Sequence, residues 1–119
     1  MHPLKQKILD YCISLPNVEE SFPFDNRTWV AKVHGKMFAL MDMIDEDVRI
    51  NLKCEPHRAE ELRESFDFII PGYHMSKKHW NTILCNNSPI DWLFLKDLID
   101  HSYHMVFLSL PKKFRATDS

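Results

Sequence analysis

TWVAKVHGKMFALMDMIDEDVRINLK, residues 28–53, predicts three antiparallel β-strands joined by short turns. The strands are expected at residues 27–33, 36–41 and 48–53. Between the first two, His34-Gly35 favours a tight hairpin turn, because glycine supplies the positive φ that such a turn requires. Side chains follow a period of two in the first strand, and apolar and polar residues alternate in the third, as in a sheet with one buried face. The other face is therefore expected to be polar and cationic, and to carry Arg49, Asn51 and Lys53.

Helical periodicity appears on both sides of this region. Helices are expected at residues 3–15, 55–65 and 88–109. The last is expected to begin with Ser88 as its N-cap and Pro89 as its first residue, a favourable combination at a helix start. Short strands are expected at residues 68–70 and 79–84. Residues 17–26, with acidic residues and Phe-Pro neighbours, are expected to form a loop that packs its aromatic side chains against the domain.

These elements follow the order α-β-β-β-α-β-β-α. Because the connections are short hairpins or single helices, the simplest architecture is a two-layer α+β fold. We expect one five-stranded antiparallel sheet with the helices packed on one face. A chain of 119 residues that is 45% hydrophobic suits a single domain with its own core, which we place at residues 1–113. Residues 114–119 are expected to form a flexible polar tail.

Charge and cysteine content argue against several classes of protein. The 15 basic and 17 acidic residues give a net charge of −2, so no global cationic field attracts nucleic acid or anionic lipid. The three cysteines lie far apart without a C-x-x-C pair, which favours free thiols in a reducing compartment. No apolar run reaches the roughly 18 residues of a membrane span, and the N-terminus lacks the apolar core of a signal peptide. We therefore expect a cytoplasmic protein that does not associate with membranes.

The candidate catalytic and metal-binding patterns are weak. Cys54-x-x-His57 and His101-x-x-His104 have spacings that a metal could use, yet a structural zinc site needs four ligands and no second matched pair is present. His101 and His104 are instead expected to face solvent on the last helix. The sequence contains no common nucleophile motif and no glycine-rich phosphate loop. We therefore expect no enzyme activity, no catalytic residues, no metal and no cofactor.

One segment, IPGYHMSKKHWN at residues 70–81, is dense in groups that recognise ligands. Pro71-Gly72 favours a turn, so the residues after it are expected in a surface connection. Lysines can neutralise phosphates while exposed aromatic rings stack on bases. The candidate nucleic-acid-binding residues are Tyr73, His74, Lys77, Lys78, His79 and Trp80. The alternative is structural, with Tyr73 and Trp80 as core residues at strand ends and the two lysines solvating the turn.

Five segments carry a resemblance to a known family. They are LPNVEESFPF at 15–24, VHGKMFAL at 33–40, INLKC at 50–54, IPGYHMSKKHWNT at 70–82 and LIDHSY at 98–103. In these segments, which span nearly the whole chain, the sequence resembles the MmcQ/YjbR family of small bacterial proteins. The resemblance implies a CyaY-like, secretion-chaperone-like α+β fold. It also implies a DNA-binding role, described as a double-wing motif, and it supplies no catalytic residues.

Two functions follow as expectations. The first is a small non-enzymatic protein that binds DNA weakly, in a salt-dependent manner, through residues 73–80. The alternative is a protein-interaction or chaperone-like module that docks a peptide or a second copy through the open sheet face or an apolar patch. In either case the expected state is a monomer or a weak homodimer.

Overall fold

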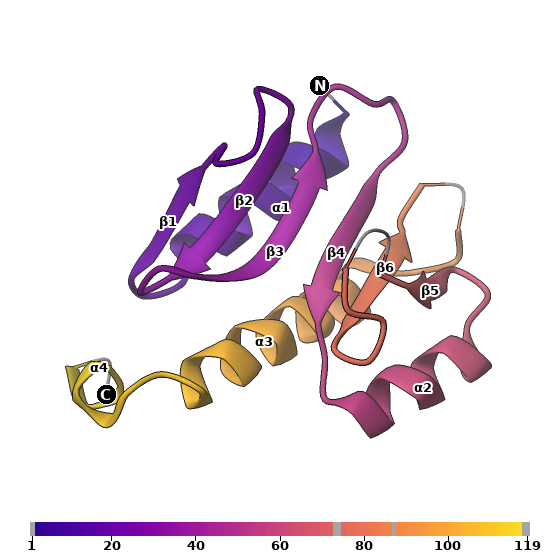
Figure 1. Ribbon diagram of the computed structural model, residues 1–119. Coiled ribbons are helices and arrows are strands. Elements are labelled where there is room, and N and C mark those ends of the chain that lie inside the picture. The colour runs from indigo at the N-terminus through magenta and orange to yellow at the C-terminus, as the bar shows by residue number, and fades with distance from the viewer. Residues whose placement is uncertain (1, 73–74, 87, 118–119) are drawn as a thin grey trace.

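The computed structural model describes residues 2–72, 75–86 and 88–117 (Figure 1). Over these residues the helices are α1 (Pro3–Ser14), α2 (Pro56–Ser65), α3 (Trp92–Leu108) and α4 (Lys112–Thr117). The strands are β1 (Val18–Ser21), β2 (Thr28–Val33), β3 (Lys36–Asp42), β4 (Arg49–Lys53), β5 (Ile69–Pro71) and β6 (Trp80–Leu84). The chain is therefore an α+β protein, as the sequence predicts.

The six strands form one antiparallel sheet in the order β1-β2-β3-β4-β6-β5. β1 to β4 follow one another in the sequence, whereas β6 inserts between β4 and β5. This insertion places Lys53 of β4 opposite Trp80 of β6. α1 and α3 lie behind the sheet in Figure 1, and the opposite face, which we call the open face, is turned toward the viewer.

The main hydrophobic core lies between the sheet and the helices. Trp29, Ala31 and Val33 of β2 point into it and are fully buried, which confirms the alternation predicted for this strand. α1 and α3 contribute apolar side chains at helical spacing, namely Ile8, Cys12, Leu95, Leu98, Ile99, Tyr103 and Val106. The helix layer is thus held by residues whose burial follows from local periodicity.

One polar side chain lies inside this core. Ser102 of α3 is fully buried, and its hydroxyl donates a hydrogen bond of 2.5 Å to the backbone carbonyl of Phe38 in β3. The same oxygen accepts a hydrogen bond of 2.8 Å from the backbone N–H of Lys53 in β4. Buried backbone groups need partners, so this single hydroxyl satisfies one group on each of two neighbouring strands and ties both to α3.

The prediction of five strands is wrong, because residues 18–21 form the additional strand β1. β1 pairs with β2 at the edge of the sheet, with Val18 opposite Val33. Edge strands tolerate charged, outward-pointing residues, so the exposed Glu19 and Glu20 do not interrupt it but remove the alternating apolar signal. Two aromatic residues of the following loop are exposed rather than packed against the domain, Phe22 and Phe24.

α3 begins later than the sequence predicts. Its N-cap is Asp91, whose carboxylate accepts a hydrogen bond of 2.8 Å from the backbone N–H of Phe94. Ser88 lies before the helix and donates to the carbonyl of Cys85 instead. Asp91 is the better cap because a carboxylate accepts a charge-assisted hydrogen bond and also interacts favourably with the positive end of the helix dipole.

The segment after α3 also differs from the expected flexible tail at 114–119. Residues 112–117 form the short helix α4. The ring of Phe114 stacks on the ring of His34, with a centroid distance of 4.6 Å. This contact attaches α4 to the turn between β2 and β3. Phe114 is the aromatic residue of an otherwise largely polar segment, and stacking on His34 gives its ring a partner. Residues 118 and 119 lie outside the described residues.

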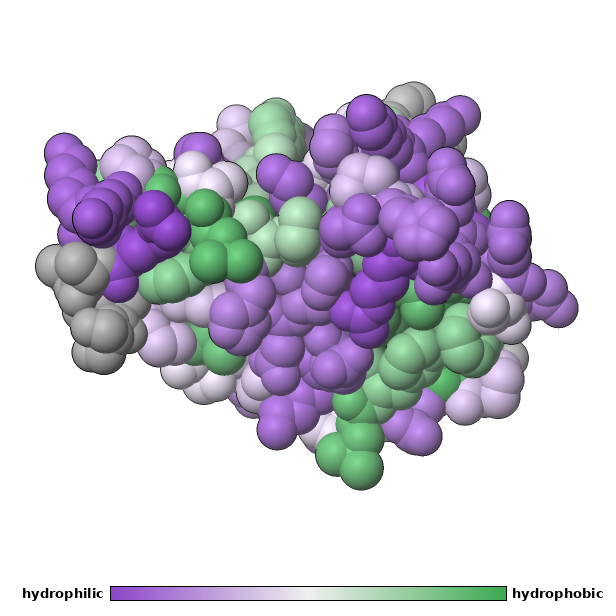
Figure 2. All heavy atoms as spheres, turned by 90° about the horizontal axis from the view of Figure 1, so that it is seen from below, coloured by the Kyte–Doolittle hydropathy of each residue, from purple (hydrophilic) through white to green (hydrophobic). Residues whose placement is uncertain are grey.

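Figure 2 shows the molecule from below, where a hydrophilic band crosses the middle and hydrophobic residues are visible on both sides of it. Two of the most exposed apolar side chains lie near the two ends of α3, Leu93 at 75% exposure and Leu108 at 62%. In the part of the chain that the structure describes, every helix is too short or too polar to cross a membrane.

Candidate functional site

The open face carries a second, smaller hydrophobic cluster, although the sequence predicts a polar and cationic surface there. Val30 of β2, Leu40 of β3 and Trp80 of β6 are buried in this cluster. Met37 and Met75 are partly buried and pack against it. The described helices do not contribute to it, so the segment that holds Met75 supplies part of its cover. The open face is therefore partly apolar on strands β2, β3 and β6.

A groove of about 590 Å³ adjoins this cluster. Its lining combines strand residues with one residue from each of two loops: Phe24, Thr28, Met37, Leu40, Met41, Asp42, Asn51 and Met75. Most of these side chains are apolar, and the flexible methionines Met37 and Met75, which come from different segments, can adapt to different shapes. A concave surface with apolar walls and a few polar groups is typical of ligand-binding sites.

The polar groups of the groove already have partners. Asp42 forms an ion pair of 2.9 Å with Arg27. Burial acts to raise the pKa of the Asp42 carboxyl, but hydrogen bonds from the backbone N–H groups of Asp45 and Ile44 and from Arg27 hold that pKa below its ordinary value. Asn51 accepts a hydrogen bond from the hydroxyl of Thr82. The negative charge in the groove is therefore compensated by Arg27.

Met75, which lines the groove, is followed in the chain by residues 76–80, which we call the lysine turn. Within the turn, the backbone N–H groups of His79 and Trp80 both donate to the carbonyl of Ser76, at 3.3 and 2.9 Å. Just before it, the N–H of Gly72 donates to the carbonyl of Trp80 at 2.9 Å. A Cβ atom on Gly72 would lie only 2.8 Å from the Cβ of Trp80, so this close approach of the two segments requires glycine.

The lysine turn is also held from outside. The backbone N–H of Cys54 donates to the carbonyl of His79 at 2.8 Å. Arg63 of α2 donates at 2.9 Å to the carbonyl of Lys77 and at 2.9 Å to the side-chain oxygen of Asn81. These bonds connect the turn to the end of β4 and to α2, and they fix its backbone while its lysine side chains remain exposed.

The structure separates the candidate nucleic-acid-binding residues into groups. Lys77 and Lys78 are exposed, as expected for contact residues, and His79 is half-buried. Trp80 is only 8% exposed, so its ring is a core residue of the open-face cluster and does not present a free face for a base to stack on. Trp80 therefore fits the alternative prediction, in which it is a core residue at a strand end. Tyr73 and His74 lie outside the described residues.

Three lysines border this part of the open face. Lys77 and Lys78 lie on the lysine turn, and Lys53 is the cross-strand neighbour of Trp80. Within the described ranges, the ion pairs on or near this face are Arg27–Asp42 and Arg49–Asp47, and none of the three lysines pairs with a carboxylate. The surface beside the apolar groove is therefore locally positive although the chain as a whole is slightly negative.

The three cysteines are free thiols buried in the protein. Burial raises the pKa of Cys12 and of Cys85 to about 12, and burial also raises the pKa of Cys54. A thiol with a raised pKa stays protonated at neutral pH and is a poor nucleophile. Across residues 2–72, 75–86 and 88–117, no three His, Cys, Asp or Glu side chains come together in a way that could hold a metal ion.

His101 does not face solvent as the sequence predicts. It is half-buried, and its Nε2 atom accepts a hydrogen bond of 3.1 Å from the backbone N–H of Glu55. His104, one turn later, is exposed. The periodicity of α3 places both histidines away from the apolar stripe of the helix. His101 is nevertheless half-buried because it contacts Glu55 at the start of α2, and the position of α2 relative to α3 could not be predicted from the sequence.

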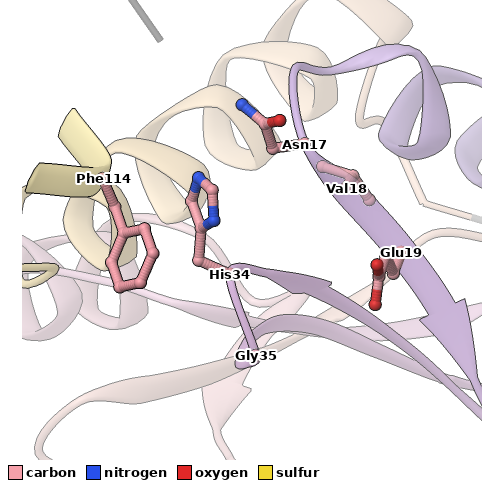
Figure 3. Close-up of a pocket in the computed structure, with 6 residues that line it drawn as sticks. All are labelled: Asn17, Val18, Glu19, His34, Gly35 and Phe114. Atoms are coloured by element: carbon pink, nitrogen blue, oxygen red, sulfur yellow. The ribbon is translucent and has the colours of Figure 1, made fainter. Parts of the chain in front are cut away.

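A second hollow, of about 610 Å³, lies where α4 meets the sheet (Figure 3). It is lined by Asn17, Val18, Glu19, His34, Gly35 and Phe114. The described residues with positive φ all lie here, Asn17 at 61°, His34 at 47° and Gly35 at 82°. Positive φ at both His34 and Gly35 confirms the tight hairpin turn predicted between β2 and β3. In Figure 3 the side chains of Asn17 and Glu19 point away from each other, so they do not converge on a common point.

Comparisons with known proteins identify relatives along almost the whole chain. The family described as YjbR matches residues 13–105. Protein YjbR of Escherichia coli strain K12 is 30% identical over 110 residues, which are 92% of each chain, and protein YbdF of Escherichia coli O157:H7 is 36% identical over 85% of this chain and 82% of its own. Both relatives are named only as uncharacterised proteins.

Two crystal structures share the fold. A Deinococcus radiodurans protein is 35% identical, with a TM-score of 0.88 over 97% of this chain and 90% of its own. A Pseudomonas syringae protein is 26% identical, with a TM-score of 0.73 over 86% of this chain and 97% of its own. The matched sequence positions and the shared fold lead to one assignment. This chain belongs to the YjbR family.

Proposed function

We propose that this protein is a non-enzymatic binding protein whose ligand docks on the open face, in the groove beside the lysine turn. The single observation that carries the proposal is the groove itself, about 590 Å³ in volume and walled by Met37, Leu40 and Met75. The same three residues also belong to the open-face cluster, in which Trp80 is buried. An apolar groove of this size stabilises a ligand mainly by removing apolar surface from water.

The chemistry of the surroundings favours a protein segment as the ligand. Methionine-lined surfaces suit apolar side chains of varied shape, because the thioether chain is flexible and polarisable. Lys53, Lys77 and Lys78 form no ion pair with a described carboxylate, so acidic residues beside an apolar anchor would complement them. The proposed ligand is therefore an acidic segment with at least one large apolar side chain.

The absence of catalysis is part of the proposal and is supported by the state of the thiols. Cys12, Cys54 and Cys85 are all buried, and burial raises the pKa of each. Nucleophilic catalysis by cysteine requires an accessible thiolate, usually with a lowered pKa. The groove lining contains Asp42 as its acidic group, and Arg27 already neutralises that carboxylate.

Selection of peptides tests this function. We expect random peptides selected on the wild-type protein to contain an apolar anchor with acidic neighbours. The double variant Met37→Gln/Met75→Gln, which keeps side-chain size but makes the walls polar, should bind the selected peptides about tenfold or more weakly. Fluorescence titration with labelled peptide measures the affinities. Leu93→Gln is the control, because it makes an exposed apolar residue of α3 polar, and it should leave the affinities unchanged. If the wild type, the double variant and this control bind the peptides equally, the ligand does not dock in the groove.

Nucleic acid is a second candidate ligand, favoured by the exposed Lys77 and Lys78 on a turn whose backbone is fixed by Arg63. Two or three lysines give few phosphate contacts, so binding through them would be weak and would depend only moderately on salt. The burial of Trp80 removes one of the two aromatic rings that the sequence offers for stacking.

Fluorescence anisotropy with labelled single- and double-stranded DNA tests this candidate. If the lysine turn is the contact, wild-type affinity should fall with salt with a slope that corresponds to about 2–4 phosphates. Lys77→Glu/Lys78→Glu should abolish binding. Lys112→Glu/Lys113→Glu on α4 changes the net charge by the same amount and should retain most of it. Equal loss in both double variants would show that only net charge matters, and no binding at low salt would rule this ligand out.

A further inference from the structure

Residues 53–55, from the last residue of β4 to the N-cap of α2, are attached to α3 by two hydrogen bonds from their backbone. The N–H of Lys53 donates to the hydroxyl of Ser102 at 2.8 Å. The N–H of Glu55 donates to Nε2 of His101 at 3.1 Å. Ser102 and His101 are adjacent on α3, so two neighbouring side chains of one helix position the end of β4 and the start of the next helix.

The same segment also positions the lysine turn. The N–H of Cys54, between these two bonded residues, donates to the carbonyl of His79 at 2.8 Å. Glu55 is the N-cap of α2, and its carboxylate accepts hydrogen bonds from the N–H groups of His57 and Arg58. From α2, Arg63 donates to the carbonyl of Lys77. The turn is thus held by two routes that both pass through the residues bonded to α3.

His101 is the titratable member of this network. Its Nε2 atom can accept the bond from Glu55 only while it carries no proton, so the neutral ring with a proton on Nδ1 is the form that fits. Burial lowers the pKa of His101 below its ordinary value and Arg58 adds to this effect, while Asp97 and Glu55 oppose it and His104 lowers it further. Arg58 and Asp97 face the ring from α2 and α3 and are themselves paired at 2.9 Å.

We propose that His101 is a proton-sensitive latch that sets the position of the lysine turn, and with it that of the adjacent groove residue Met75. In its neutral form the ring holds the start of α2 through Glu55. A proton on Nε2 replaces an acceptor by a second donor that faces the N–H of Glu55, so this bond is lost and the restraint on residues 53–55 weakens. The effect on ligand binding rests on the proposed function, whereas the movement of the turn does not.

The direction of the pH dependence follows from the lowered pKa of His101. The folded protein binds fewer protons at this site than the unfolded chain, so the contribution of the latch to stability is fully present above the ordinary histidine pKa of about 6.5. It is lost as the pH falls through the lower pKa of the folded state. The latch is therefore closed at neutral pH and opens in mild acid.

NMR titration of the ligand-free protein tests the latch. Between about pH 8 and pH 5, the amide signals of Glu55, Lys77 and Lys78 should shift with the same midpoint as the ring carbons of His101, below the ordinary histidine value. Hydrogen exchange of the Glu55 amide, corrected for the intrinsic effect of pH, should become about tenfold faster when His101 is protonated. A flat response of the lysine turn while the His101 ring titrates would overturn the proposal without any reference to a ligand.

Histidine variants separate the latch from its neighbours. His101→Gln replaces the ring with an amide oxygen that can accept the bond but does not titrate, so the shifts of Lys77 and Lys78 should disappear. His79→Gln removes the histidine of the turn itself and should keep the wild-type midpoint. His104→Gln removes the exposed neighbour that helps to lower the pKa of His101, so the His101 ring and the turn should move together to a slightly higher midpoint. Turn signals that still titrate in His101→Gln would overturn the proposal. If His101→Gln does not fold, the wild-type titration decides. Equal midpoints for the His101 ring and the amides of Lys77 and Lys78 support the latch, and different midpoints overturn it.

Discussion

Replacement of Ser102 by alanine is expected to lower the free energy of unfolding by about 2–4 kcal/mol, because it leaves two buried backbone groups without a partner. The hydroxyl donates to the carbonyl of Phe38 and accepts from the N–H of Lys53, and its residue is fully buried. The lost volume is one oxygen atom, so the cost arises from the unsatisfied groups and not from a cavity. Urea unfolding with an unchanged m-value measures it.

Ser109→Ala is the matched control. The Ser109 hydroxyl donates to the carbonyl of Val106 at the end of the same helix, but its residue is exposed, so water can replace the bond. A change of less than about 0.5 kcal/mol is expected there. If Ser102→Ala is as stable as the control, the bond between α3 and the two strands contributes nothing, and the attachment of residues 53–55 must come from His101 alone.

Replacement of Gly72 by alanine is expected to destabilise the fold by about 1–3 kcal/mol through steric overlap. The added Cβ would lie 2.8 Å from the Cβ and 3.0 Å from the carbonyl oxygen of Trp80. The two segments cannot separate freely, because the N–H of Gly72 donates to that same carbonyl at 2.9 Å. Thermal unfolding measures the loss, and the fluorescence of Trp80 should report a displaced ring.

Ser76→Ala is the control for this position. It changes an exposed side chain of the same loop and leaves the backbone bonds of the lysine turn intact, so its unfolding temperature should equal that of the wild type. Wild-type stability of Gly72→Ala would mean that the loop moves away from Trp80 without cost. In that case the loop that carries Met75 to the groove is not held in one position, contrary to what the proposed function requires.

Several parts of the fold follow from local sequence patterns alone. The alternation of Trp29, Ala31 and Val33 predicts which side of β2 is buried, and both hairpin and helix signals locate β3, β4, α1 and α2 to within a few residues. These features depend on neighbours two to four positions away, where side-chain direction is set by the backbone period. The strand β1 was not predicted, because an acidic edge strand does not need an apolar face.

The candidate site divides in the same way. Exposure of Lys77 and Lys78 follows from the polar turn that contains them, and the sequence left two interpretations of Trp80 open. Burial of Trp80 depends on Val30 and Leu40, which lie on strands distant in sequence. Ser102 could have been noticed in the sequence, because it is a polar residue on the apolar stripe of α3. Its two partners, the carbonyl of Phe38 and the N–H of Lys53, could not be predicted from the helix pattern.

The sequence by itself determined the α+β class, the three central strands, the family resemblance and the position of the basic turn, since each is encoded in residues close together along the chain. Only the tertiary structure decided that β6 lies between β4 and β5. That insertion brings Trp80 beside Lys53, and Met75 and Met37 both line the groove on the open face. The groove exists because strands distant in sequence pair by backbone hydrogen bonds, and such pairing carries no local pattern from which it could be predicted.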